Sequence, residues 1–353
     1  MGARAQRQTP CRVSCVLPGL VWSAPFGEAL PPLPGLAALL GHGRVKHLPG
    51  EPHAAWLSRQ FGAENLSWGA LRWAGEGEPP LPGCHTLCAD PVSLGFRREP
   101  LLLHGPKTLA LQPEETAALV EALNAEFSAL GRFQAAGPER IYLHCTDPVE
   151  ARFAPVFEAI GRPLGLFEPE GPDAARWTRL ANEIQILLHH HPLNRTREAR
   201  GQPRVNALWF WGETVVGQPD APADTLIGDE PLLRGLAAAS GARWLSSVEA
   251  GSPSRGLAGH TWRWDGSLHD AALAGDFSCW LAALRAIDAE LLQPLWQAWR
   301  SGHLRELALL APADGRFLET RLGLAQRLAF WKRPLSKAAL QAALQPPIQK
   351  DQP

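Results

Sequence analysis

Several residue types and patterns are scarce in this chain of 353 residues. It has one Tyr, Tyr142, and its one Met is Met1. The 34 Lys and Arg are balanced by 35 Asp and Glu, so the formal net charge is −1. This near-neutrality removes the electrostatic argument for a nucleic-acid partner or an anionic membrane surface. No run approaches 18 apolar residues, so we expect no membrane span and no membrane partner.

The six cysteines are not preceded by a recognisable signal peptide. No apolar segment of sufficient length lies before Pro18. We therefore expect a cytoplasmic, reducing location and free thiols. One alternative is a single zinc site made by Cys11-x3-Cys15 and Cys84-x3-Cys88, whose spacing is looser than that of paired CxxC motifs. Because nothing else supports zinc, the pattern favours buried or incidental thiols.

The composition is that of a globular protein. Apolar residues make up 45% and charged residues 20% of the chain, which excludes a mostly disordered protein. The length predicts about two domains. The 14 Trp offer one further hypothesis, a scaffold whose exposed tryptophans bind a protein partner, although burial in the core explains most of them.

The pattern of apolar runs predicts an α/β fold with an insertion. Alternating helices and strands from residue 172 onward, with an almost wholly apolar strand over 205–211, are typical of a parallel sheet covered on both faces. Residues 85–145 instead show a hairpin, an amphipathic helix over 113–130 and a further strand, which suits a small α+β module.

We therefore predict a doubly wound, mixed or parallel sheet with helices on both faces, interrupted by an inserted α+β domain. The predicted bounds are 11–83 and 166–331 for the discontinuous α/β core, 84–165 for the inserted domain and 332–353 for a flexible tail.

Common catalytic motifs are absent from the sequence. There is no GxxxxGK[ST] phosphate loop, no GxGxxG after a strand, no HExxH and no GxSxG. The densest polar segment lies at 182–212, where His191, Asn194, Arg197 and Asn206 form a candidate anion site. Arg197 would hold a phosphate or carboxylate with two parallel hydrogen bonds. The alternative is structural: His191 ends a helix, and the two Asn satisfy buried backbone groups.

The same segment carries a resemblance to a known family. Residues 168–212, EPEGPDAARWTRLANEIQILLHHHPLNRTREARGQPRVNALWFWG, resemble the archaeal-type 2,3-bisphosphoglycerate-independent phosphoglycerate mutases, which have an alkaline-phosphatase-like fold. The resemblance continues in order over about 11–330. The segments VLPGLVW, CADPV, GPDAARW, HHHPLN and WFWG further resemble a bacterial branch of that family, the type E regulatory proteins of a cluster that controls pathogenicity factors.

The resemblance implies a reaction that needs two divalent metals, such as Mn²⁺ or Mg²⁺, and a Ser or Thr nucleophile. No clear nucleophile matches, although Ser23 lies nearby. The positions that match the family's metal ligands mostly hold residues that cannot replace them. They are Pro18-Gly19, His269, Leu273, Ala311-Pro312 and Arg321.

The sequence thus favours a relative of the mutases without catalytic residues or bound metal. Its expected role is regulatory, or the binding of a small phosphorylated or carboxylated ligand, with a possible protein partner. The alternative is an active cofactor-independent phosphoglycerate mutase or phosphotransferase, an isomerase with two divalent metals at a rebuilt site. Asp265, His269, Asp270 and Asp276 would then supply the ligands.

Overall fold

The computed structural model describes residues 11–24, 26, 30–63, 66–96, 101–213, 217–252, 258–313 and 316–345. The chain divides into two compact units. Unit 1 comprises Met1–Phe61, Ala221–Glu230 and Gly241–Pro353. Unit 2 comprises Gly62–Asp220 and Pro231–Ser240.

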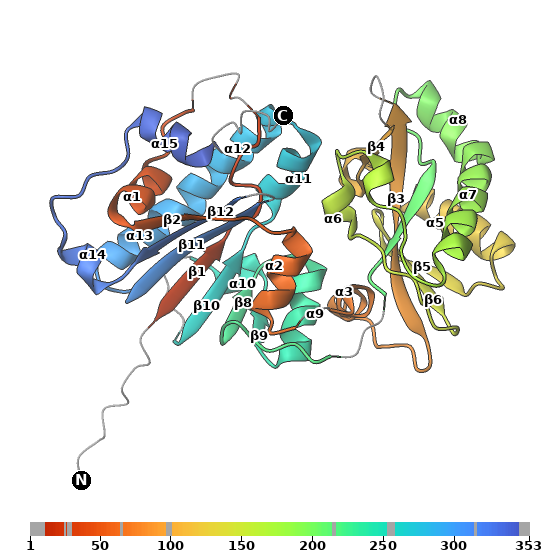
Figure 1. Ribbon diagram of the computed structural model, residues 1–353, viewed down its shortest axis with the longest axis horizontal. Helices are drawn as coiled ribbons and strands as arrows, with labels where there is room; N and C mark the ends of the chain where they lie inside the picture. The colour runs from red at the N-terminus through yellow and green to blue at the C-terminus, as the bar shows by residue number, and fades with distance from the viewer. Residues whose placement is uncertain are drawn as a thin grey trace, which may run out of the picture. The chain divides into compact units, whose positions relative to one another are not determined.

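Unit 1 is built on a mixed sheet which, in the described residues, has seven strands in the order β2-β12-β11-β1-β10-β8-β9 (Figure 1). Strands β11, β1, β10, β8 and β9 run parallel; at one edge β12 pairs antiparallel with β11, and β2 pairs antiparallel with β12. The strands are β1 (Arg12–Val16), β2 (Arg44–Leu48), β8 (Thr225–Ile227), β9 (Arg243–Leu245), β10 (His260–Trp264), β11 (Glu306–Ala313) and β12 (Arg316–Leu322).

Helices cover both faces of this sheet. On one face, Val13 and Cys15 of β1 join the core that is formed with α1, α12 and α13. On the other, Trp56 of α2 stacks on Trp262 of β10, with ring centroids 5.9 Å apart. The helices of unit 1 are α1 (Pro34–His42), α2 (His53–Gln60), α10 (Ser247–Ala250), α11 (Ser267–Ala274), α12 (Phe277–Ile287), the π-helical turn η2 (Asp288–Leu292), α13 (Gln293–Arg300), α14 (Leu324–Leu328) and α15 (Lys337–Leu344).

Unit 2 contains an antiparallel sheet in the order β4-β3-β6-β5, and β7 also pairs with the long strand β3. Its strands are β3 (His85–Phe96), β4 (Leu101–His104), β5 (Arg132–Gly137), β6 (Arg140–Cys145) and β7 (Ala207–Trp211). Its helices are α3 (Trp68–Gly75), α4 (Pro106–Leu109), α5 (Pro113–Glu126), α6 (Val156–Ala159), the 3-10 turn η1 (Leu164–Leu166), α7 (Ala174–His190), α8 (Pro192–Ala199) and α9 (Pro231–Ser240).

Helices cover both faces of the sheet of unit 2. Helices α5 and α7 pack on one face of the sheet through Leu119, Leu123 and Ile184. Helix α3 lies on the other face, where Arg72 forms a buried ion pair with Asp90 of β3, at 2.7 Å. The predicted fold class, a doubly wound α/β core with an inserted α+β domain, is confirmed.

The predicted domain bounds differ from the observed units. The second unit is larger than the predicted 84–165, because β7 joins its sheet, α3 and α7 pack on that sheet, and α9 and α8 pack on those two helices. Strand β7 pairs antiparallel with β3, so the expectation of a parallel strand over 205–211 is wrong. An apolar run shows that both faces are covered, but it does not reveal the strand's direction.

The predicted flexible tail, 332–353, contains an ordered helix in the described residues. Helix α15 begins with Ser336, whose side chain accepts a hydrogen bond from the Ala339 backbone N–H. Leu340 and Leu344 are buried in the core of unit 1. Burial of these two leucines therefore holds this segment in place; residues 346–353 lie outside the described residues.

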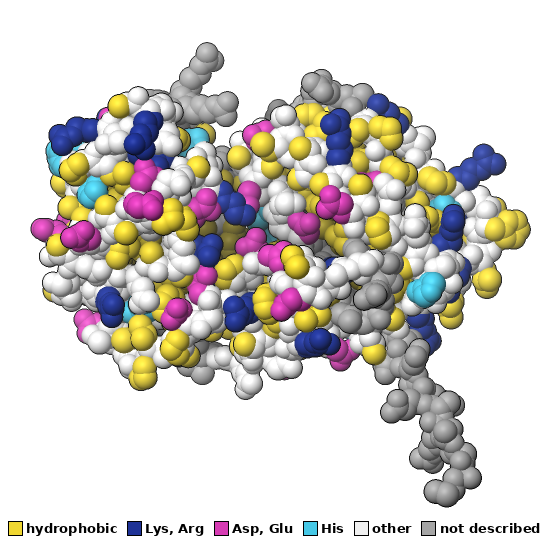
Figure 2. Space-filling view, turned by 180° about the vertical axis from the view of Figure 1, so that it is seen from behind, with side chains coloured by type: hydrophobic (Ala, Val, Ile, Leu, Met, Phe, Trp, Pro, Cys, Tyr) yellow, Lys and Arg dark blue, Asp and Glu magenta, His cyan; other side chains and the backbone are white. Residues whose placement is uncertain are grey.

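No described helix is long and apolar enough to cross a membrane. On the face drawn in Figure 2, the Lys and Arg side chains are interspersed with the Asp and Glu side chains, and neither sign gathers into one large patch. This face matches the near-zero net charge of the sequence.

Candidate functional site

Three of the residues predicted to form an anion site bond to the backbone around them. His191 caps α8, and its Nδ1 accepts a hydrogen bond from the Leu193 backbone N–H at 3.2 Å. The Asn194 amide donates to the carbonyl of Leu188 and to that of Val205, and its oxygen accepts from the Val205 N–H at 2.8 Å.

The Asn206 side chain also bonds to the backbone: it accepts a hydrogen bond from the Leu94 N–H at 2.7 Å and donates one to the Leu94 carbonyl at 2.8 Å. These two hydrogen bonds connect the residue before β7 to β3. Burial also lowers the pKa of His191, which makes its imidazole less able to carry the positive charge that an anion would require.

Arg197, the fourth predicted residue, is fully buried, with 0% of its surface exposed. Its Nε donates to the Pro203 carbonyl at 2.8 Å, and its two terminal nitrogens donate to Glu115 at 2.7 Å and to the Leu109 carbonyl at 2.5 Å. The guanidinium is therefore neutralised and held by the protein. These hydrogen bonds match the structural alternative for the four residues, whereas anion binding at 191, 194, 197 and 206 stays a prediction.

The position that resembles the mutase metal site at the end of β1 is closed by backbone. Pro18 and Gly19 are buried, and Gly19 has a φ of +77°. A Cβ at Gly19 would lie 2.6 Å from the Cα of His269, so nothing larger than glycine fits. The Gly19 carbonyl accepts a hydrogen bond from the Trp280 indole at 2.8 Å. This turn therefore has no carboxylate to offer a cation and no space for one on Gly19.

The other matching positions also fail to converge. Ala311 and Pro312 lie within β11 and pair with β12, while Arg321 of β12 forms ion pairs with Glu319 and with Glu306. Among the described residues, no three His, Cys, Asp or Glu side chains come close enough together to hold a metal ion. The donor set therefore does not fit the two divalent metals that the resemblance implies.

Of the four residues proposed for a rebuilt metal site, His269 and Asp270 lie on α11, and Asp265 and Asp276 lie at its opposite ends. Asp265 precedes the helix and accepts hydrogen bonds from the Ser267 N–H and hydroxyl, at 2.9 and 2.6 Å. Asp276 follows it and caps α12, accepting from the Cys279 N–H at 2.9 Å. Eight helical residues span about 12 Å, so these two carboxylates cannot share one ion.

A different cationic side chain in unit 1 does face a cavity. The cavity has a volume of about 380 Å³ and lies at the carboxyl ends of β8 and β10, beside α12 and η2. Arg263 of β10 lines it together with Ile227, Ser247, Asp265 and Glu290. Ligands of open α/β sheets bind at this end of the strands.

Arg263 is only 8% exposed, and its guanidinium has no hydrogen-bond or ion-pair partner among the described residues. Its neighbour in register, Cys15, does not compensate the charge, because burial raises the pKa of that thiol and keeps it neutral. Burial also lowers the pKa of Arg263, although an arginine stays charged near neutral pH. An uncompensated buried charge is costly, and a bound anion would relieve that cost.

Sequence reasoning missed Arg263, although a signal was present. Buried parallel strands are nearly continuous apolar runs, and the strand His260–Trp264 is interrupted by one arginine. A charged side chain at such a position either pairs with an acceptor in the protein or faces a cavity where a ligand can supply the acceptor. The sequence does not distinguish these two cases, because the answer depends on which elements pack beside the strand.

Curated relatives of this chain are phosphoglycerate mutases. It is 27% identical over 106 residues to 2,3-bisphosphoglycerate-independent phosphoglycerate mutase 2 of Methanothermobacter thermautotrophicus, which covers 29% of this chain and 26% of that protein. It is 32% identical over 69 residues to the 2,3-bisphosphoglycerate-independent phosphoglycerate mutase of Methanothrix thermoacetophila, covering 20% and 17%. The alignments thus span about a quarter or less of these relatives. The chain matches no family model.

Solved structures extend the similarity to nearly the whole chain. The PH0037 protein of Pyrococcus horikoshii aligns over 95% of this chain and 93% of its own, with a TM-score of 0.52 and 14% identity. A cofactor-independent phosphoglycerate mutase of Thermoplasma acidophilum aligns over 95% and 99%, with a TM-score of 0.45 and 14% identity. Over the two short alignments the chain is thus similar in sequence to phosphoglycerate mutases, and its fold is similar to that of the PH0037 protein.

Proposed function

We propose that this chain is a phosphoglycerate-mutase-like protein that does not carry out metal-dependent phosphoryl transfer and instead binds a small phosphorylated or carboxylated ligand in a regulatory role. The observation that carries the proposal is the closed turn at Pro18-Gly19, where the family resemblance requires a carboxylate. Without two cations, a phosphoryl group in transfer has no positive charge to stabilise it, and no described residue cluster supplies a substitute.

The cavity at Arg263 is where we propose that the anion binds. A buried guanidinium that lacks a protein partner presents its donors to a phosphate or carboxylate in the planar geometry that those groups accept. Asp265 is already engaged by Ser267, so it competes less for the arginine. The ligand would be held at the end of the sheet without a nucleophile beside it.

The regulatory part of the proposal includes a protein partner in the cytoplasm that responds to the ligand. Support comes from the segment around α14, where Leu328, Phe330 and Trp331 are 75%, 89% and 69% exposed. A contiguous group of large exposed apolar side chains often marks an interaction site, whereas single exposed apolar side chains are common on any protein surface.

A turnover assay tests the absence of phosphoryl transfer. Purified protein is incubated with 3-phosphoglycerate and either Mn²⁺ or Mg²⁺, and 2-phosphoglycerate formation is followed while the metal content is measured by elemental analysis. We expect no turnover above the blank and less than stoichiometric metal. Robust metal-dependent conversion would show an active mutase and end the proposal.

A thermal-shift titration with inorganic phosphate tests the anion site. A ligand at 100 times its Kd stabilises a protein by about 2.7 kcal/mol, so phosphate should raise the Tm of the unmodified chain measurably. Arg263→Met should remove this shift. Arg285→Met is the matched control, because Arg285 is exposed on the neighbouring helix α12 and does not line the cavity. An equal phosphate shift in both variants would contradict a site at Arg263.

A further inference from the structure

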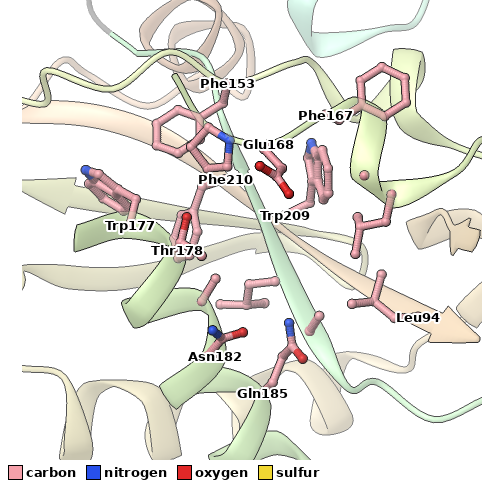
Figure 3. Close-up of a pocket in the computed structure, with 16 residues that line it drawn as sticks. Leu94, Phe153, Phe167, Glu168, Trp177, Thr178, Asn182, Gln185, Trp209 and Phe210 are labelled. Carbon is pink, nitrogen blue, oxygen red and sulfur yellow. The ribbon is translucent and has the colours of Figure 1, made fainter. Parts of the chain in front are cut away.

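Unit 2 contains a cavity whose walls are mostly aromatic. It has a volume of about 300 Å³ and lies between α7, β7 and the segment around η1 (Figure 3). We call it the aromatic cavity; the rings that line it belong to Phe153, Phe167, Trp177, Trp209 and Phe210. Its size is at the lower end of the range for small-molecule sites, and its predominantly apolar lining is typical of them.

The walls of the aromatic cavity are fixed by contacts among the rings themselves. Trp177 packs edge to face against Phe153 and Phe210, with ring centroids 5.3 and 5.2 Å apart. The Trp209 indole N–H donates a hydrogen bond to the Ala154 carbonyl at 2.8 Å, which orients its ring. A preformed site loses little conformational entropy when a ligand enters, and this favours binding of even a small molecule.

Besides the buried indole N–H of Trp177, three polar side chains at the aromatic cavity have no hydrogen-bond or ion-pair partner in the part of the chain that the structure describes. They are Glu168, Asn182 and Gln185. Figure 3 shows the Glu168 carboxylate beside the Trp209 ring and the two amides extending from α7. The nearby Thr178 differs, because its hydroxyl donates to the Ala174 carbonyl at 3.0 Å.

The charge of the residues that line the aromatic cavity favours a positively charged ligand. Glu168 is the one charged residue among those that line the aromatic cavity in the described structure. A phosphate or carboxylate would meet this carboxylate and no cationic side chain among the lining residues. The guanidinium of Arg162 lies over the Phe167 ring, 4.7 Å from its centroid, so the faces of the other rings are the ones that can attract a bound cation.

We propose that the aromatic cavity binds a small organic ammonium compound. Its apolar body packs against the rings of Trp177 and Phe210, and its ammonium group lies between the Glu168 carboxylate and the Trp209 ring. The amides of Asn182 and Gln185 bond to any polar substituent at the other end. This ligand is opposite in charge to the one proposed for Arg263 and binds in the other unit, so the two proposals stand or fall separately.

A set of three probes of one shape tests the proposal on the full chain. They are 2-phenylethylammonium, the neutral 2-phenylethanol and the anionic 3-phenylpropionate, with binding followed by calorimetry and tryptophan fluorescence. One partly exposed ion pair and one cation–π contact together predict that the ammonium binds about tenfold more tightly than the alcohol. The propionate should bind more weakly than either.

Substitutions test whether the preference for the ammonium probe arises at the aromatic cavity. Glu168→Gln should abolish the preference for the ammonium and leave affinity for the alcohol unchanged. Glu170→Gln is the matched control, since Glu170 is exposed, pairs with Arg152 and does not line the cavity. Ala181→Phe should fill the cavity and weaken binding of all three probes. Equal affinity for the three probes, a preference that survives Glu168→Gln, or no saturable binding would each overturn the proposal.

Discussion

Two buried arginines, one in each unit, show opposite ways of keeping a positive charge inside a protein. Arg197 in unit 2 is 0% exposed, and all three of its guanidinium nitrogens donate to protein acceptors. Arg263 in unit 1 is 8% exposed, lines a cavity of about 380 Å³ and has no partner among the described residues. Burial is common to both. The set of acceptors around each guanidinium is what separates a structural arginine from a candidate binding residue.

The sequence suggests Arg197 as the candidate anion-binding arginine, whereas the structure favours Arg263. Arg197 lies in a segment rich in His, Asn and Arg, which drew attention to it, whereas Arg263 lies alone in a strand. A dense group of polar residues in a loop has many backbone groups to satisfy, and the structure shows that these side chains are used in that way. In a strand, the backbone groups already pair with the neighbouring strands, so an isolated charged side chain there has no nearby backbone group to satisfy.

The largest expected effect is the loss of stability in Arg197→Met. Removal of this guanidinium leaves the Glu115 carboxylate, which is only 9% exposed, without its ion pair at 2.7 Å. Breaking a buried pair from one side costs about 3 to 5 kcal/mol, and we expect a loss of that size in the free energy of unfolding. Urea denaturation measures it. Arg195→Met, at an exposed position on the same helix, serves as control, and a loss below about 1 kcal/mol in Arg197→Met would refute the structural role.

A pair of asparagines on one stretch of unit 2 extends the comparison. Asn194 makes three hydrogen bonds to buried backbone, so Asn194→Ala should lower the free energy of unfolding by about 2 to 3 kcal/mol. Asn182 is exposed and lines the aromatic cavity, so Asn182→Ala should change it by less than about 0.5 kcal/mol. Similar losses of stability in both variants would show that the three hydrogen bonds of Asn194 do not stabilise the fold.

The sequence was sufficient for the kinds of element and for the fold class, but not for their assignment to units. The apolar run over 205–211 indicates a strand that is buried on both sides, and the structure has one, β7. Its antiparallel partner β3 lies more than a hundred residues earlier, and no local pattern marks such a pairing. The boundary at 62 rather than 84 follows in the same way, from α3 packing on a sheet that forms later in the chain.

The site was harder to predict than the fold, for a related reason. The sequence offered both a binding and a structural interpretation of Arg197, and the choice depended on Glu115 and the Leu109 carbonyl, which lie about eighty residues away. Glu168 and Trp209 of the aromatic cavity are likewise far apart in sequence. Residue type limits the possible chemistry, but long-range packing decides which donors and acceptors meet.

His144 in unit 2 illustrates a third way to bury a base, which is to keep it neutral. It is 3% exposed, and burial together with the charge of Arg132 lowers its pKa to about 4. The unfolded chain, with a histidine pKa of about 6.5, therefore binds more protons, and stability falls as the pH drops from about 6.5 toward 4.

The expected slope from this one group is at most about 1.4 kcal/mol per pH unit. Urea denaturation at pH 7 and at pH 5 measures it, and His144→Gln should reduce the difference between the two values. His190→Gln, at an exposed position, should leave the difference as it is. If His144→Gln retained the full pH dependence, another buried group would have to be responsible.

The smallest expected change, and the direct counterpart of Arg197→Met, is that of Arg263→Met. Because Arg263 has no described partner to lose, removal of its charge should leave the free energy of unfolding within about 1 kcal/mol of the unmodified chain, or raise it, when phosphate and carboxylates are absent. The same urea denaturation applies, in a buffer without such anions. A loss as large as that of Arg197→Met would mean that Arg263 has an acceptor in the folded protein, and the distinction between a structural and a ligand-facing arginine would no longer hold.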